Sequence, residues 1–170
     1  PAIRIAVEPW SGQLPRPRLV PSWDGLSPQA LIEAIRQAGV VGLGGAAFPT
    51  HVKLAPPKDR PIDCIVVNGC ECEPYLTTDH RTMVEYPERV HLGIRIMMTC
   101  LGVRRALIGV ERNKPDAVAA LQAALPGDLD VTVQALTVKY PQGAEKMLIH
   151  ALLGREVPSG TWVVTVRPAT

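Results

Sequence analysis

The stretch that decides the fold runs from residue 62 to residue 110 and reads IDCIVVNGCECEPYLTTDHRTMVEYPERVHLGIRIMMTCLGVRRALIGV. It starts with a short, nearly continuous apolar run, Ile62–Val67, and ends with a second one, Arg105–Val110. Between them, Pro87–Leu101 carries apolar residues at helical spacing and is followed by Gly102, a residue that commonly ends helices. Continuous apolar runs are typical of parallel strands buried on both faces. The stretch therefore predicts a strand–helix–strand unit of a parallel sheet.

The same alternation continues toward the C-terminus. Lys114–Leu125 has a helical pattern with Pro115 in its first turn, and Leu129–Leu136 has the pattern of a third strand. Gln142–Leu153 predicts a third helix, which Gly154 ends. Strands and helices that alternate in this way indicate an α/β fold, with a mainly parallel sheet covered by helices on both faces.

The N-terminal side differs in composition. Residues 1–26 contain five of the 17 prolines and one short predicted strand, Ile3–Val7, so we expect an extended arm or linker. Ser27 then provides an N-cap and Pro28 the first position of a helix that Gly39 ends. We therefore expect an arm over 1–26 and a folded core that begins at residue 27.

Composition bounds the class of protein. A chain of 170 residues with 46% hydrophobic and 20% charged residues is long and apolar enough for one globular domain with a real core. No apolar run reaches the roughly 18 residues that a membrane span needs. The net charge of +2, without basic clusters, argues against a nucleic-acid partner. The four cysteines form no CxxC pair, so we expect reduced thiols and a cytoplasmic location.

A glycine-rich loop precedes the first core strand: residues 42–53 read GLGGAAFPTHVK. Glycines allow close approach of the backbone to a ligand, and successive N–H groups can bind an anion, with Lys53 adding a positive charge. The loop also fits the G-x-G-x-x-A dinucleotide pattern. It follows a helical pattern instead of a strand, however, and Phe48-Pro49 interrupts where the fingerprint helix should continue. A simple turn between helix and strand is the alternative.

Polar residues follow the first core strand, where parallel sheets gather ligands. Asn68 can donate and accept hydrogen bonds, as the edge of a heterocycle requires, and Glu71 and Glu73 can accept from ribose or ribityl hydroxyls. A solvated acidic turn is the alternative. Cys70 and Cys72 are too close for an unstrained disulfide and lack partners at zinc or cluster spacing, so no metal site is predicted.

Two further segments, around Gly143 and around Asp79, are predicted to begin helices. Gly143 and the first amides of the helix after Tyr140 offer an anion or carbonyl site. Glu145 is either part of that site or a partner of the helix dipole. Asp79 is predicted to be the N-cap of another helix.

Taken in order, these segments resemble a known family. The glycine loop ends in Phe-Pro-Thr-x-x-Lys, the strand exit reads Asn-x-x-Glu-x-Glu-Pro, and the segment before the last helix reads Tyr-Pro-x-Gly-x-Glu. This order is similar to the C subunit of the Rnf ion-translocating electron-transport complex, and more distantly to the flavin- and NADH-binding subunit of respiratory complex I. Glu111–Pro115 and Leu153–Gly160 favour the Rnf type. The resemblance spans residues 27–160.

The resemblance implies a three-layer, Rossmann-like domain over 27–160 that binds FMN noncovalently and oxidises NADH. It also implies that residues 161–170 form a short, truncated C-terminal strand. It implies no catalytic side chain and no metal ligand. By position, the FMN contacts would be Gly42, Gly44, Gly45, Ala46, Lys53, Asn68, Glu71, Gly143, Glu145 and Thr170. The NADH contacts would be Phe48, Glu73, Tyr140 and Glu145.

The resemblance also implies a setting. Electrons would pass to iron–sulfur centres in a part of the family protein that is absent here, and the subunit would lie peripherally on the cytoplasmic face of the membrane, without a span of its own, bound by other subunits of an electron-transport complex. Complex I proteins carry Asp and Ser in place of Cys70 and Cys72, and Arg167-Pro168 falls where a flavin-contacting Asn is expected. Two alternatives therefore stay open: a flavin-free scaffold or docking module, and a cobalamin reductase-like flavoprotein of the same family.

Overall fold

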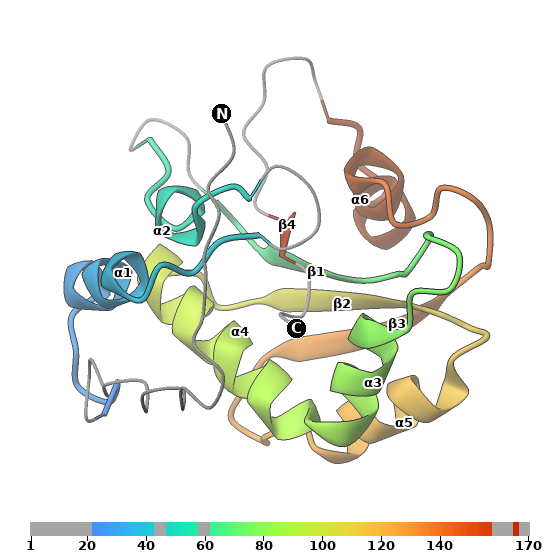
Figure 1. Ribbon diagram of the computed structural model, residues 1–170, viewed down its shortest axis with the longest axis horizontal. Coiled ribbons are helices and arrows are strands. Elements are labelled where there is room, and N and C mark those ends of the chain that lie inside the picture. The colour runs from blue at the N-terminus through green and yellow to red at the C-terminus, as the bar shows by residue number, and fades with distance from the viewer. Residues whose placement is uncertain (1–21, 43–46, 58–61, 158–164, 167–170) are drawn as a thin grey trace, which may run out of the picture.

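A four-stranded parallel sheet forms the centre of the chain (Figure 1). The computed structural model describes residues 22–42, 47–57, 62–157 and 165–166. The elements are α1 (Pro28–Gln37), α2 (Thr50–Lys53), β1 (Ile65–Gly69), α3 (Thr78–Glu85), α4 (Pro87–Leu101), β2 (Ala106–Glu111), α5 (Pro115–Ala123), β3 (Val131–Leu136), α6 (Glu145–Leu153) and β4 (Thr165–Val166). The predicted strand Ile3–Val7, and with it most of the expected arm, lies outside the described residues.

The strand order is β3-β2-β1-β4. β1 pairs with β2 from Ile65↔Ala106 to Gly69↔Val110, and β2 pairs in turn with β3. The chain then returns past β1, where Val66 pairs with Thr165 of β4. The order of the strands thus reverses between β1 and β4, and such a reversal is where open α/β sheets bind ligands.

Helices cover both faces of the sheet, as predicted (Figure 1). Successive residues of a strand point to opposite faces. Accordingly, Ile65 and Val67 belong to the core under α3, α4 and α5, whereas Val66 belongs to the core under α6. Burying each such aliphatic side chain contributes about 1.5–3 kcal/mol, so the two cores fix the three layers. The α/β, Rossmann-like prediction is confirmed.

Gly109 lets α6 pack directly against β2. A Cβ atom at this position would lie 2.7 Å from Cδ1 of Leu148 and 2.9 Å from Cδ1 of Leu136. Both distances are shorter than real Cβ contacts, so the side chains of Leu148 on α6 and Leu136 on β3 would have to shift to admit a larger residue.

The predicted helix ends are largely confirmed. Ser27 Oγ accepts a hydrogen bond from the Ala30 amide at 3.2 Å, which caps α1. Gly39, Gly102 and Gly154 follow α1, α4 and α6 with φ of 66°, 67° and 64°, the left-handed conformation that glycine adopts most easily. The start predicted for the last helix was wrong. α6 begins at Glu145 rather than Gln142, because residues 139–144 form tight turns.

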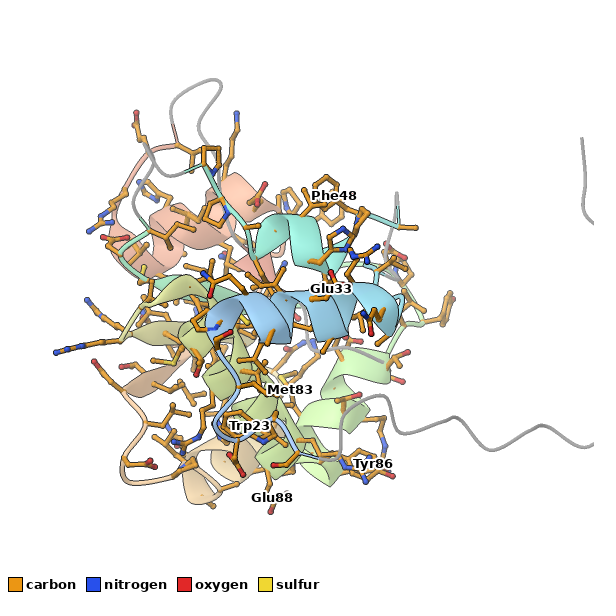
Figure 2. The ribbon with its side chains drawn as sticks, turned by 90° about the vertical axis from the view of Figure 1, so that its left-hand side faces the viewer. Trp23, Glu33, Phe48, Met83, Tyr86 and Glu88 are labelled. Atoms are coloured by element: carbon orange, nitrogen blue, oxygen red, sulfur yellow. The ribbon has the colours of Figure 1, made fainter. Side chains whose placement is uncertain are left out.

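A third cluster joins the N-terminal helices to the domain. Leu31 of α1, Leu54 after α2 and Cys100 of α4 are buried together. Figure 2 shows α1 and α2 side by side at this end of the molecule, with Phe48 beside α2. No helix within the described ranges is long and apolar enough to cross a membrane.

Candidate functional site

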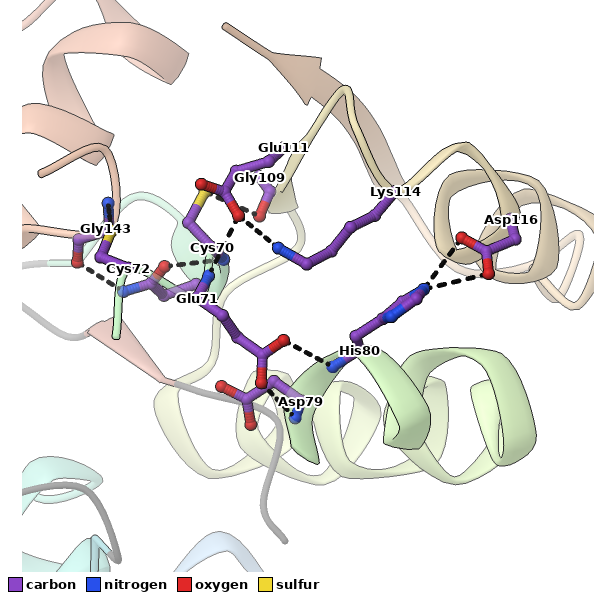
Figure 3. A network of polar contacts seen from close by, with 11 residues as sticks. Cys70, Glu71, Cys72, Asp79, His80, Gly109, Glu111, Lys114, Asp116 and Gly143 are labelled. Atoms are coloured by element: carbon purple, nitrogen blue, oxygen red, sulfur yellow. Dashed lines mark hydrogen bonds and ion pairs between the residues drawn. The ribbon is translucent and has the colours of Figure 1, made fainter. Parts of the chain in front are cut away.

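Polar residues from the carboxyl ends of β1, β2 and β3 meet at one edge of the sheet. They line an open pocket of about 250 Å³, formed by Glu71, Cys72, Glu111, Asn113, Val138, Lys139 and Tyr140. Figure 3 shows the network of hydrogen bonds and ion pairs that organises this edge. The structure thus brings the segments that follow β1, β2 and β3 together in one pocket.

Asn68 joins the exit of β1 to the segment before α6. Its side chain is only 4% exposed. The amide Nδ2 donates to the carbonyl oxygen of Gly143 at 2.8 Å, and Oδ1 accepts from the backbone N–H of Cys70 at 3.1 Å. Because an amide offers two donor hydrogens and two acceptor lone pairs, Asn68 retains one of each for other partners.

Gly143 lies directly against the loop that follows β1. Its N–H donates to Sγ of Cys72 at 3.0 Å. A Cβ atom here would lie 2.8 Å from the carbonyl oxygen of Cys70 and 3.1 Å from Sγ of Cys72. Only glycine permits this approach, so Gly143 has a packing role in addition to the ligand role predicted for it. The sequence did not reveal the part played by Cys72, because its partner is 71 residues away.

Glu71 caps helix α3. Its Oε1 accepts from the Asp79 amide at 2.8 Å and its Oε2 from the His80 amide at 3.2 Å. These N–H groups of the first turn have no partner within the helix, and a carboxylate there also interacts favourably with the helix dipole. The prediction that Asp79 caps this helix was wrong. The N-cap position is Thr77, Asp79 lies within the first turn, and Glu71 reaches across from the preceding loop.

Glu111, the last residue of β2, is a buried carboxylate, 5% exposed. It forms an ion pair with Nζ of Lys114, and its Oε2 accepts the backbone N–H of Glu71 at 3.3 Å. Burying a charge requires such a partner, since an unpaired carboxylate would be strongly disfavoured. A Glu–Lys pair three residues apart at the end of an apolar strand is the signal that could have predicted this pair.

The network continues into α5. Nε2 of His80 lies 2.9 Å from Oδ1 and 3.0 Å from Oδ2 of Asp116 (Figure 3). This hydrogen bond lowers the pKa of the Asp116 carboxyl. Three carboxylates, a lysine and a histidine thus connect the exits of β1 and β2 with α3 and α5 in one continuous network.

Several predicted ligand contacts are exposed at or near the same edge. The Tyr140 side chain is 83% exposed and lines the pocket. Glu73 lies in the loop after β1, and Glu145 is the first residue of α6; both are exposed.

Gly42, Phe48 and Lys53 form a second group, at the α1–α2 end. The Gly42 N–H donates to the Phe48 carbonyl at 2.9 Å, and Val41 and Pro49 form an antiparallel bridge, so the residues on the two sides of 43–46 are held together. Lys53 Nζ lies 5.8 Å from the centroid of the Phe48 ring, which is 41% exposed. As predicted, the loop follows a helix and lacks the strand–loop–helix context of a dinucleotide fingerprint.

Four predicted FMN contacts, Gly44, Gly45, Ala46 and Thr170, lie outside the described residues. No group of three or more potential metal ligands occurs in the part of the chain that the structure describes. The four cysteines, all within that part, are free thiols, and burial raises the pKa of Cys64 and brings that of Cys100 to about 11. Cys100 is buried, as expected, whereas Cys64 is only partly so.

Known proteins resemble this chain. The family model for the Nuo51 FMN-binding domain matches residues 35–167. The chain is 51% identical over 151 residues to the C subunit of the proton-translocating ferredoxin:NAD(+) oxidoreductase complex of Clostridium ljungdahlii, covering 89% of this chain and 32% of that protein. It is 53% identical over 137 residues to the C subunit of the Na(+)-translocating ferredoxin:NAD(+) oxidoreductase complex of Acetobacterium woodii, covering 81% of this chain and 31% of that protein.

The chain thus spans about a third of the length of these two relatives. Among solved structures, it resembles the NAD+-reducing NiFe hydrogenase in its air-oxidized state, with a TM-score of 0.67 and 24% identity, over 83% of this chain and 28% of that one. This likeness concerns the fold. From the match over most of its length, the chain belongs to the Nuo51 FMN-binding domain family, and within it resembles the C subunits of ion-translocating ferredoxin:NAD(+) oxidoreductase complexes.

Proposed function

We propose that this chain binds FMN and forms the NADH-oxidising part of an electron-transport subunit. The observation that carries the proposal is the joint at Gly143, where Asn68 and Cys72 connect two of the three segments on which the resemblance rests. In a chain of an FMN-binding family, such a joint at the carboxyl edge of a parallel sheet supports a ligand site there.

The residues fit the two nucleotides by their chemistry. Phe48 presents an exposed ring that can stack on the nicotinamide or adenine ring of NADH, with the Lys53 cation 5.8 Å from its centroid. Asn68 retains one donor and one acceptor. FMN would be bound by Gly42, Gly44, Gly45, Ala46, Lys53, Asn68, Glu71, Gly143, Glu145 and Thr170.

Because both oxygens of Glu71 already accept hydrogen bonds from α3, we infer that Glu71 acts on the ligand mainly by positioning the loop after β1. Phe48, Glu73, Tyr140 and Glu145 would bind NADH. An exposed carboxylate suits the ribose hydroxyls of a nucleotide, which are hydrogen-bond donors.

The chemistry of hydride acceptance would belong to the bound FMN, which can take two electrons at once and release them singly. The chain would contribute orientation, by placing the nicotinamide against the flavin, and would need no acid or base of its own. In the complete subunit, electrons would then pass to iron–sulfur centres. The partners would be other subunits of an ion-translocating complex, at the cytoplasmic face of the membrane.

The test is a titration of the purified chain with FMN, followed by flavin fluorescence, and then addition of NADH. Saturable binding and bleaching of the flavin by NADH are expected. Glu145→Gln should weaken reduction by NADH more than it weakens FMN binding, and Glu88→Gln, an exposed acid on α4, serves as the matched control.

Equal losses of binding and reduction in Glu145→Gln would contradict the role given to this residue. A folded chain with no affinity for FMN would instead favour the scaffold or docking alternative. Reduction by NADH without any dependence on membrane partners in the cell would favour the cobalamin reductase-like alternative.

A further inference from the structure

We propose that Cys72 is a positioning residue: together with Asn68 it fixes the segment 140–145 and thereby sets where Tyr140 and Glu145 meet the nucleotide. The inference deepens the proposed function and rests on it. It assigns a role to a thiol that, among the described residues, belongs to no disulfide and to no cluster of metal ligands.

Both backbone polar groups of Gly143 are bound by side chains from the exit of β1. The carbonyl accepts from Asn68 Nδ2 at 2.8 Å, and the N–H donates to Cys72 Sγ at 3.0 Å. Gly143 is buried, so neither group can turn to solvent instead. Asn68 and Cys72 therefore hold Gly143 in place through both of its backbone polar groups.

The sulfur of Cys72 accepts a hydrogen bond from a backbone N–H that has no acceptor within α6. Gly143 precedes the N-cap Ala144, so its N–H lies outside the hydrogen-bond ladder of the helix. Without an acceptor at Cys72, this buried donor would lose its partner, and the segment would have to move to restore one.

A movement at Gly143 would reach the predicted ligand contacts directly. Glu145 opens α6 two residues later, and Tyr140 lines the pocket three residues earlier. Cys72 lines that same pocket. The joint thus lies between the two side chains whose placement it would set.

The experiment compares Cys72→Ala, which removes the acceptor, with Cys72→Ser, which keeps one. Cys64→Val is the control, since Cys64 precedes β1 at the opposite end of the strand and packs under α6. Three quantities are measured on the purified chain: hydrogen exchange of the Gly143 amide without nucleotide, the dissociation constant for FMN, and KM for NADH in flavin reduction.

We expect Cys72→Ala to speed exchange of the Gly143 amide and to raise KM for NADH, each about fivefold, the factor that one ordinary hydrogen bond contributes. The FMN dissociation constant should rise by a smaller factor than KM, because only two of the ten proposed FMN contacts, Gly143 and Glu145, lie on the segment 140–145, whereas two of the four proposed NADH contacts do. Cys72→Ser should return both values toward those of the wild type, and Cys64→Val should leave them unchanged.

An unchanged rate of hydrogen exchange at the Gly143 amide in Cys72→Ala would refute the claim that Cys72 holds Gly143, whatever the values for FMN and NADH are. Faster exchange with an unchanged KM would refute the positioning role while leaving the proposed function intact. A wild-type chain that does not bind FMN would overturn the proposed function and the positioning role together, and the exchange data would then report only on the joint itself.

Discussion

Replacing Gly143 by alanine tests the central packing contact of the candidate site. The added Cβ would lie 2.8 Å from the carbonyl oxygen of Cys70, 3.1 Å from Sγ of Cys72 and 3.3 Å from Cβ of Cys70. The nearest of these atoms belongs to the backbone and cannot rotate away. Gly143 is not among the residues with positive φ, so any cost arises from this contact and not from backbone strain.

The size of the effect follows from the geometry. To relieve a 2.8 Å contact, the two segments must separate by several tenths of an ångström, which lengthens the hydrogen bonds at 2.8 Å and 3.0 Å that Gly143 makes. Overpacking costs about 1–3 kcal/mol and each weakened hydrogen bond about 0.5–1.5 kcal/mol. Since two hydrogen bonds are weakened, we expect the free energy of unfolding to fall by about 2–6 kcal/mol.

Urea denaturation followed by circular dichroism measures this change, and a second glycine provides a control of opposite sign. Gly93 lies within α4, and a Cβ atom at this position would meet none of the described residues' atoms within 4 Å. Gly93→Ala should therefore stabilise the chain by about 0.5–1 kcal/mol through helix propensity.

A double variant separates the backbone contact from the thiol contact. Cys72→Ala removes the second-nearest atom but not the carbonyl oxygen of Cys70, so it should not rescue Gly143→Ala. A loss below about 0.5 kcal/mol in Gly143→Ala, the range of ordinary surface substitutions, would refute the reasoning, and so would full rescue by Cys72→Ala.

Three further predictions concern the surrounding residues. Glu71→Ala should lower the free energy of unfolding by about 0.5–2 kcal/mol in urea denaturation, since α3 loses its cap, and Glu71→Gln should lose less; equal stability of Glu71→Ala and wild type would argue against the cap. Gln142 is 1% exposed, and its Nε2 has no hydrogen-bond partner among the described residues. A buried donor without a partner costs about 1–3 kcal/mol, so Gln142→Met should raise the melting temperature. A lower melting temperature would contradict this expectation. Because the His80 hydrogen bond lowers the pKa of Asp116, the stability that Asp116 contributes over Asp116→Asn should be present above the unfolded value of 3.8. It should be lost progressively as the pH falls from 3.8 through the lowered pKa of the folded state, and a difference between the two proteins that does not shrink as the pH falls below 3.8 would exclude this origin.

The parts of the fold that the sequence predicts are those encoded by neighbours along the chain. The apolar runs of β1 and β2 and the helical stripe of α4 depend on local periodicity, and the left-handed glycines after α1, α4 and α6 depend on a single residue. Each of these signals is complete within a few residues, so the elements and their parallel arrangement follow from it.

The parts that could not be predicted depend on contacts across the chain. Asp79 is a reasonable N-cap by residue type, but Glu71 takes that role because the intervening loop brings its carboxylate to the helix. The Cys72–Gly143 bond likewise arises only once β1 and α6 are packed on the same sheet. Local patterns predict which residues lie at a strand exit. They do not predict which of these residues, such as Glu71 and Cys72, form hydrogen bonds that hold the neighbouring segments in place.

The pairing of β4 with β1 has a consequence for folding order. Val66 and Thr165 are about a hundred residues apart, so this pairing closes a far longer loop than β1–β2 or β2–β3 does. Closing a longer loop costs more chain entropy, and among the described residues two pairs, Val66↔Thr165 and Val67↔Val166, offset it. During synthesis, β1, β2 and β3 can assemble before β4 has left the ribosome, so the side of the sheet where the strand order reverses should form last and open first.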